Sequence, residues 1–316
     1  MESNWYMTLA LRFKNFLHRL RPRQSHIPQW TKQGVVWAGQ YVAADPYVVE
    51  TAAGVRTMYY TDYDGWTVPD TLRNYINKAT ETGDDGAWAD AGAAKVPEID
   101  EWCEADETAC MFESVLYFCG NDDDADEFNM PSHIGRGAGA GATKIIEVTE
   151  GTRYASAATS PAIIRDGDTL YMLFCGHDYV EPINVPCLMG ATSIDDGVNW
   201  TVQDVVLDAQ PNLLWASEGV AEPAIVKRGG RFWLFFTGVR AVGASEYRAI
   251  GQAHAPHPLG PYTVLPDAII TETNSATHQS LAPHVIYKNG KWRMWYTYAV
   301  PGDGTYAVHY ATANTG

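Results

Sequence analysis

The sequence has little positive charge, few charged residues of any kind and no long hydrophobic run. Its 316 residues include 22 Lys and Arg against 38 Asp and Glu, which gives a formal net charge of −16. This balance argues against a nucleic-acid partner, because phosphate backbones are bound by clustered Lys and Arg. We also expect no membrane-spanning segment in the chain, since no apolar run reaches the roughly 18 residues that cross a bilayer.

Cysteine is scarce and is not arranged in metal-binding pairs. The chain has five cysteines and no CxxC motif. This pattern indicates neither a zinc knuckle nor a dense disulfide framework. Cys119 and Cys175 each end an aromatic stretch, and we expect both to be buried thiols. A bridge between Cys103 and Cys110 stays open, and so does the redox compartment.

The N-terminus lacks the continuous apolar core of a secretory signal peptide. Residues 1–23 carry five basic residues and one acidic residue, and the basic ones interrupt the apolar stretch. Its large apolar side chains recur at helical spacing, at Leu9, Phe13, Phe16, Leu17 and Leu20. We predict an amphipathic helix and linker over residues 1–32, outside the main domain. This helix packs on its own domain or docks on a membrane surface or a partner.

Aromatic side chains, glycine and proline are abundant, and they are organised in an internal repeat. The chain has 11 Trp, 18 Tyr, 9 Phe, 28 Gly and 17 Pro, which favours strands and turns. Residues 159–176, 221–238 and 281–298 each contain a short apolar strand, a turn built on Gly and an aromatic strand, a hairpin pattern. A fourth copy occupies 44–62, and a degenerate fifth occupies 105–121.

The copies follow one another at a nearly constant interval. Aligned on the residue before Pro, they start near 45, 106, 160, 222 and 282, with Glu107 in place of Pro in the second copy. Four-stranded units of roughly 40–60 residues are typical of propeller blades, whereas a β-sandwich has no reason to repeat in this way. We predict an all-β, five-bladed β-propeller over residues 33–316. Gln33–Ala38 is predicted to supply the fourth strand of the last blade and close the ring.

In such a ring the first residues of the innermost strands gather at one mouth. The aligned positions hold Asp45, Asp106, Ser160, Glu222 and Ala282. Glycosidic bond cleavage uses two carboxyl groups, one donating a proton to the leaving oxygen and the other activating water or attacking the anomeric carbon. An acidic chain also places carboxylates at turns by composition alone. The three acids at the aligned positions therefore favour this chemistry only modestly by themselves.

The segment ADPYVV, followed by an aromatic strand and later copies of the same hairpin, resembles the five-bladed propeller glycoside hydrolases. These are the family 43 arabinanases and xylosidases, with the related families 32, 62 and 68, and the resemblance covers about residues 34–316. It implies hydrolysis of an arabinan-, xylan- or fructan-like glycan. It also implies that Asp45 is the general base or nucleophile and that Glu222 is the general acid.

This chain departs from the family pattern at two positions. The family's acid-tuning Asp is replaced by Ser160, which cannot raise a neighbour's pKa through like charge. Glu222 directly precedes Pro223, where the family has Glu two residues before Pro. Asp106 is the candidate that supplies the missing carboxylate, and Glu218 is a reserve acid on the same loop. These departures support an alternative, a non-catalytic propeller that binds glycan or protein through the same mouth. A scaffold subunit docked by the N-terminal helix is a third interpretation.

Aromatic and histidine side chains complete the predicted mouth. Trp37 and Trp215 lie outside the second-strand repeats and suit the apolar faces of sugar rings. His278 and His284 begin the last blade; we expect His284 to contact substrate. The family's channel histidine implies a calcium ion on the axis, with His278 as its ligand, although the reaction requires no cofactor. A glycan substrate suggests an extracellular protein and the missing signal peptide suggests the opposite, so localisation stays open.

Overall fold

The computed structural model describes residues 28–39, 42–63, 74–82, 87–95, 103, 105–121, 131–138, 142–178, 185–242, 245–272, 277–300, 302 and 304–314. The helix predicted within residues 1–32, and the docking role predicted for it, lie outside these residues except for the end of the linker. Within the described part, no helix is long and apolar enough to cross a membrane.

The described strands form five antiparallel groups of four, in chain order. The first is β2 (Ala43–Glu50), β3 (Arg56–Tyr63), β4 (Asn74–Thr82) and β5 (Ala87–Lys95). The second is β6 (Ala105–Phe112), β7 (Val115–Asn121), β8 (Ser132–Arg136) and β9 (Thr143–Ile146). The third is β10 (Ala157–Asp166), β11 (Thr169–His177), β12 (Cys187–Ser193) and β13 (Thr201–Leu207).

The fourth and fifth groups repeat the same plan. The fourth is β14 (Gly219–Arg228), β15 (Arg231–Val242), β16 (Ser245–Ala255) and β17 (Thr263–Val264), preceded by the short 3₁₀ helix η2 (Leu214–Ala216). The fifth is β18 (Gln279–Lys288), β19 (Lys291–Val300), β20 (Thr305–Asn314) and β1 (Gln29–Trp37). One parallel pair, Ala157 with Ser132, joins the second and third groups into one continuous sheet.

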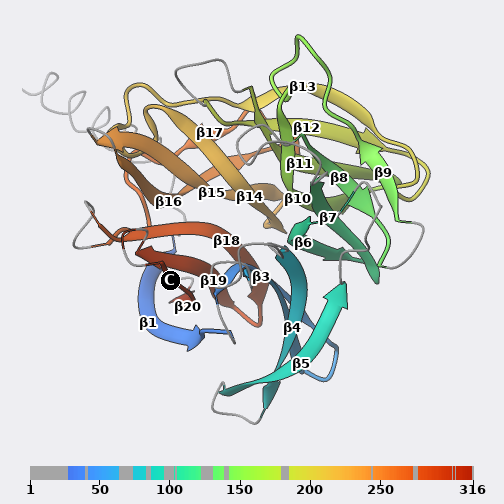
Figure 1. Ribbon diagram of the computed structural model, residues 1–316. Coiled ribbons are helices and arrows are strands. Elements are labelled where there is room, and N and C mark those ends of the chain that lie inside the picture. Colours follow the sequence, from blue (N-terminus) through green and yellow to red (C-terminus); the bar gives the residue numbers. More distant parts are fainter. Residues whose placement is uncertain are drawn as a thin grey trace, which may run out of the picture.

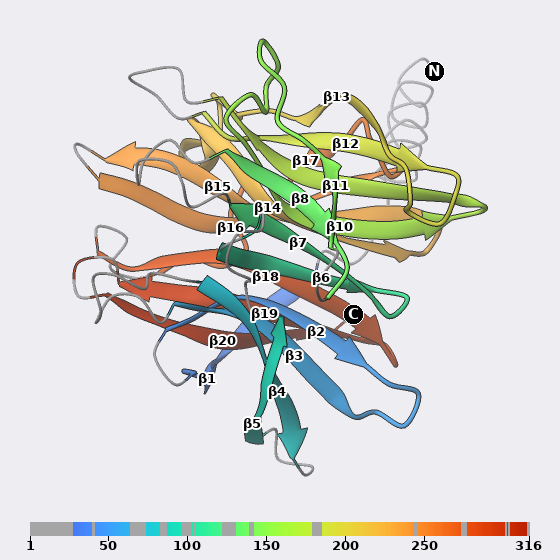
Figure 2. The same cartoon turned by 45° about the vertical axis from the view of Figure 1, so that its right-hand side comes forward.

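The five sheets are arranged around a common centre (Figure 1, Figure 2). The first strand of each sheet contacts the first strand of the next, in the order β2, β6, β10, β14, β18, and β18 in turn contacts β2. This is the arrangement of a five-bladed β-propeller, and each sheet is called a blade below. Apolar clusters fill the space between neighbouring blades, as expected for sheets that bury both faces.

The last blade takes its outer strand from the other end of the chain. β1 pairs antiparallel with β20, from Gln29 opposite Asn314 to Trp37 opposite Val308. The predicted closure by Gln33–Ala38 is therefore confirmed, although the strand already begins at Gln29. The pairing covers the edge that β20 would otherwise expose to other strands.

The cysteines pack as ordinary buried side chains. All five are buried and no disulfide joins any of them. The open question of a bridge between Cys103 and Cys110 is thereby answered. Cys119 and Cys175 lie in the second strands of their blades, as expected for buried thiols. Burial raises the pKa of the Cys175 thiol well above its usual range, so this side chain stays uncharged.

Candidate active site at the propeller mouth

A β-bulge near the start of each inner strand positions the candidate site. In four blades the bulged residue precedes Pro and has a left-handed backbone, with φ of 50° at Asp45, 52° at Ser160, 51° at Glu222 and 48° at Ala282. The ladder register shifts at the same point in each of these strands. Left-handed φ values are uncommon for residues other than glycine and often mark functional positions. The predicted alignment of these four positions is confirmed.

In the second blade the aligned position is Thr108, not Asp106. Thr108 has the left-handed φ of 51°, and the register shift of β6 lies between Glu107 and Cys110. Asp106 instead lies in regular pairing opposite Gly120, and its side chain is outside the described residues. The predicted bulge position was therefore wrong by two residues. A shift of two residues along a strand keeps the same alternation of inward and outward side chains, so the sequence pattern fits both positions. No proline marks the bulge in this blade, so periodicity alone could not place it.

Threonine hydroxyls fix the bulged residues in place. The backbone N–H of Asp45 donates to Thr297 Oγ1 at 2.8 Å. In the same way Thr108 N donates to Thr61 Oγ1 at 3.0 Å, and Ala282 N donates to Thr237 Oγ1 at 3.0 Å. Each bond links neighbouring blades, and its acceptor is a fully buried threonine of a second strand, at Thr61, Thr237 and Thr297.

These threonines were missed as site residues from the sequence. The signal was present, because the second strands of three repeats read MYYT, FFT and WYT. The matching register position in the second and third blades is Cys119 and Cys175. Ser160 N therefore takes Thr108 Oγ1 as acceptor, at 3.2 Å.

A cavity of about 730 Å³ opens at the mouth above the bulged residues. Asp45, Thr108, Ser160 and Glu222 line it. Its other charged or titratable lining residues in the described part are Glu107, His177, Glu246, Arg248 and Tyr306. A narrower channel of about 60 Å³ continues along the axis, between the prolines that follow the bulges. The two predicted carboxylates thus line one cavity.

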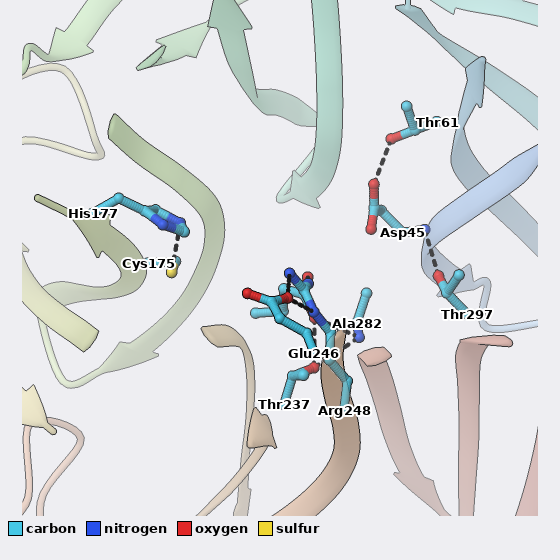
Figure 3. Close-up of polar contacts among 10 residues, drawn as sticks. Asp45, Thr61, Cys175, His177, Thr237, Glu246, Arg248, Ala282 and Thr297 are labelled. Atoms are coloured by element: carbon cyan, nitrogen blue, oxygen red, sulfur yellow. Dashed lines mark hydrogen bonds and ion pairs between the residues drawn. The ribbon is translucent and has the colours of Figure 1, made fainter. Parts of the chain in front are cut away.

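The Asp45 carboxyl group lies where its charge is disfavoured. Burial is the largest influence, followed by the negative charges of Glu222 and Glu107, and together they raise the pKa of Asp45 from 3.8 to about 8. A hydrogen bond from Thr61 Oγ1 to Asp45 Oδ2, at 3.0 Å, acts in the opposite direction but does not cancel the rise (Figure 3). Asp45 therefore holds its proton to a higher pH than an ordinary aspartate. The carboxylate sought at Asp106 is supplied by its neighbour Glu107.

The Glu222 carboxylate is surrounded by donors. Its Oε2 accepts hydrogen bonds from Thr237 Oγ1 at 2.5 Å and from Ala282 N at 2.8 Å. Its Oε1 forms an ion pair with Arg248 Nη1 at 3.2 Å. Arg248 also binds Glu246, so the guanidinium lies between the two acids at the edge of the cavity; Figure 3 shows Arg248 beside Glu246 and Thr237. Arg248 was not singled out from the sequence, since a single arginine in a strand carries no motif.

The predicted aromatic platforms do not line the mouth. Trp37 lies on the outer strand β1 and packs against Tyr60, with ring centroids 6.0 Å apart. Trp215 is buried between the third and fourth blades, and its Nε1 donates to Pro266 O at 3.0 Å. Neither tryptophan lines the mouth cavity, because an aromatic residue outside the repeated strands can still serve blade-to-blade packing, and their sugar contact stays a prediction.

The remaining predicted residues also lie away from the mouth cavity. Glu218 is exposed and lines neither cavity. His284 lines the narrow axial channel rather than the mouth, and its Nε2 contacts Val48 O at 3.0 Å. Burial lowers the pKa of His284 to about 4, so its ring is neutral. The expected substrate contacts of Glu218 and His284 are therefore not supported by their positions.

The predicted calcium ligand His278 contacts its neighbour Thr277, with Nδ1 2.6 Å from Oγ1. Among the described residues, no group of three or more His, Cys, Asp or Glu side chains gathers in a way that could hold a metal ion. The calcium ion therefore stays a prediction from the resemblance alone.

No protein-family model matches the sequence, and neither do the curated proteins that were compared with it. Solved structures do match in fold. A thermostable family-43 glycoside hydrolase is 15% identical, with a TM-score of 0.63, over 86% of this chain and 89% of its own. The endo-arabinase from Bacteroides thetaiotaomicron is 15% identical, with a TM-score of 0.60, over 90% and 98%. The catalytic domain of the GH62 α-L-arabinofuranosidase from Coprinopsis cinerea is 11% identical, with a TM-score of 0.60, over 92% and 97%.

At this level of identity the match shows the fold. The chain has the five-bladed propeller architecture shared by these glycoside hydrolase structures, as the resemblance implied.

Proposed function

We propose that the protein is a glycoside hydrolase that acts on an arabinan-, xylan- or fructan-like glycan, with Asp45 and Glu222 as its two carboxyl groups. One observation carries the proposal: two acids at equivalent bulges of different blades line the same cavity. The fold likeness to a family-43 glycoside hydrolase, an endo-arabinase and an arabinofuranosidase supports the reaction class.

The electrostatics of the cavity suit this reaction. Hydrolysis through an oxocarbenium-like transition state needs one protonated and one ionised carboxyl group. Asp45 has a pKa raised to about 8, so it holds a proton to a higher pH than an ordinary aspartate. Glu222 accepts hydrogen bonds from Thr237 and Ala282 and pairs with Arg248. The cavity volume of about 730 Å³ is within the range of small-molecule sites and has room for sugar units.

A second candidate is a non-catalytic propeller that binds glycan or protein at the same mouth. Two observations favour it. Ser160 lines the cavity where the resemblance implies a tuning aspartate, and the ion pair with Arg248 occupies Oε1 of Glu222. Under this interpretation the chain binds an oligosaccharide but releases no reducing sugar.

The test is release of reducing sugar from arabinan, xylan and fructan, together with hydrolysis of matched aryl glycosides. We expect turnover of one of these classes, and a loss of roughly 10²–10⁴-fold or more in Asp45→Asn and in Glu222→Gln. Asp204→Asn serves as the control, because Asp204 is an exposed carboxylate on β13 that does not line the cavity. Glycan retention on an affinity gel without any release of sugar would favour the binding protein instead. Turnover that survives both substitutions would place the active site elsewhere.

A further inference from the structure

A second cavity, of about 280 Å³, opens between the fifth and first blades, away from the mouth. Its lining comes from β1, β19 and β20 of the fifth blade and from β3, β4 and β5 of the first. The outer strands β1 and β5 of these blades contact each other (Figure 2). Arg56, which lines the cavity, pairs in the ladder with Glu50, five residues along β2 from Asp45. At about 3.3 Å per residue, roughly 15 Å separates it from the mouth.

Two β-bulges in β1 bring side chains to this cavity. The register of β1 against β20 shifts twice, and the residues passed over are Gln33 and Val36. Both line the cavity. In a regular strand residues three apart point to opposite faces, so the bulges are what place the two side chains at one site. Gly34 between them has a φ of 94°, which glycine adopts without strain. Bulges often re-aim side chains beside functional sites.

An arginine held between two glutamates forms the polar part of the lining. Arg56 Nε donates to Glu50 Oε2 at 2.8 Å, and Arg56 Nη1 donates to both carboxylate oxygens of Glu81 at 2.7 Å. Lys288 pairs with Glu50 from the other side, at 2.7 Å. Two cations thus balance two anions, so the cavity favours a neutral ligand over a charged one. No described residue accepts a hydrogen bond from Arg56 Nη2.

Aromatic rings form the rest of the lining. Trp295 and Tyr310 lie with their ring centroids 5.1 Å apart, and Arg56 Cζ lies 5.9 Å from the Trp295 ring. Trp88 and Tyr310 are half-buried, so part of each side chain is open to a ligand. Aromatic surface with a few fixed polar groups is the usual composition of a small-molecule site.

The third blade offers an internal comparison for Trp88. Trp88 and Trp200 each follow an Asp-Asp-Gly turn. Trp200 packs edge-on against Tyr117 of the second blade, with ring centroids 6.4 Å apart, and its Nε1 donates to Gly197 O at 3.0 Å. Trp200 therefore serves blade packing, whereas Trp88 also borders a cavity.

We propose that this cavity is a second glycan-binding site, which holds a neutral sugar unit outside the reaction centre. A sugar hydroxyl both donates and accepts, so neighbouring hydroxyls can accept from Arg56 Nη2 and donate to Glu81. The amide of Gln33 adds a donor and an acceptor, and the apolar face of the sugar ring packs on Trp88. The cavity is slightly smaller than the roughly 300–1,000 Å³ of drug-sized sites, which suits a short sugar unit.

The site is tested by ¹⁹F NMR of the full chain labelled with 5-fluorotryptophan. The signals of Trp88 and Trp295 are assigned through Trp88→Phe and Trp295→Phe, and Glu222→Gln is the background that prevents turnover. Arabinotriose, xylotriose, kestotriose and cellotriose are titrated to about 20 mM, which reveals a Kd in the millimolar range. At least one of them should shift the Trp88 signal in a saturable way.

Two results of this titration overturn the proposal. One is a Trp88 signal that none of the four neutral sugars shifts. The other is a signal that responds to inorganic phosphate or glucuronic acid but to no neutral sugar, because the site would then select an anion.

Variants of the lining are measured with the sugar that binds. Gln33→Ala should raise the Kd about 2–10-fold, the value of one neutral hydrogen bond. Gln203→Ala is the matched control and should bind as wild type, because Gln33 and Gln203 are both exposed glutamines of outer strands that donate to the carbonyl two residues before. The same Kd in both glutamine variants overturns the proposal. Thermal unfolding confirms that each variant is folded.

Trp88→Ala tests the aromatic surface, with the Trp295 signal as the reporter. We expect the Kd to rise about 10-fold or more, as for a central aromatic contact. A Trp88→Ala protein that binds the sugar as tightly as wild type overturns the proposal.

The site and the proposed function can fail independently, because no described residue lines both this cavity and the mouth. If the Trp88 signal responds but no glycan is hydrolysed, the site stands and the proposed function fails. If a glycan is hydrolysed but no neutral sugar shifts the Trp88 signal, the site fails and the proposed function stands.

Discussion

The hydroxyl of Thr297 should stabilise the protein mainly by accepting the backbone N–H of Asp45. Thr297 is fully buried and its Oγ1 lies 2.8 Å from Asp45 N. Thr297→Val keeps the size of the side chain but removes the acceptor. Because an unsatisfied buried N–H costs about 1–3 kcal/mol, we expect the free energy of unfolding to fall by that amount. Urea titration followed by tryptophan fluorescence measures it.

Two further variants separate the hydrogen bond from packing. Thr297→Ser keeps the hydroxyl and loses one methyl group, which is worth about 1 kcal/mol or less. Thr201→Val, on the exposed start of β13, should stay within about 0.5 kcal/mol of wild type. The reasoning is refuted if Thr297→Ser is as damaging as Thr297→Val, or if Thr297→Val is no worse than Thr201→Val.

Three other outcomes follow from the structure. The pKa of Asp45 rises from 3.8 to about 8 in the folded protein, so the folded state holds a proton that the unfolded chain releases between these values. Wild type should therefore lose stability as pH rises through this window, and Asp45→Asn should lose less; parallel pH–stability curves from calorimetry would contradict this. Trp215→Ala should reduce the free energy of unfolding by about 3–5 kcal/mol, because Trp215 packs between two blades. The KM for glycan should stay unchanged, and a raised KM would indicate that Trp215 contacts the substrate. If the calcium ion that the resemblance implies is bound, treatment with EDTA should lower the melting temperature and added calcium should restore it; an unchanged melting temperature would contradict that prediction.

Much of the architecture could be predicted because each copy of the repeat is recognisable from patterns of residues close together in the sequence. Each copy carries its own strand alternation, Gly turn and aromatic strand, and each inner strand but one has Pro after the bulge. These features act over a few residues, so sequence reports them directly. The closing strand could also be predicted, since a missing fourth strand in the last blade leaves an edge that another segment must cover.

The second blade shows where local pattern fails. Asp106 and Thr108 are two residues apart and lie on the same face of an extended strand, so both fit the alternation. Only the position of the bulge distinguishes them, and the structure places it at Thr108. The error mattered for the site, because the nearby carboxylate that influences Asp45 comes from Glu107.

The tryptophans show a second limit. Trp37 and Trp215 were assigned to the mouth because they stand outside the repeated strands. An aromatic ring serves blade packing and sugar binding equally well, and its role depends on which blades meet around it. Trp37 packs on Tyr60 of the first blade, and Trp215 packs on Phe236 of the fourth.

The amino-acid sequence by itself determined the number of sheets, the hairpins within them and the placing of Asp45, Ser160, Glu222 and Ala282 at equivalent bulges, because each of these depends on neighbours within a few residues. The tertiary structure alone decided the surroundings of the two carboxyl groups. Asp45 lies half-buried near acids of other blades, and Glu222 meets Arg248 from two strands away together with the backbone of Ala282 from the next blade. Electrostatic energy depends on distance and desolvation in three dimensions, so residues far apart in sequence set the pKa of Asp45.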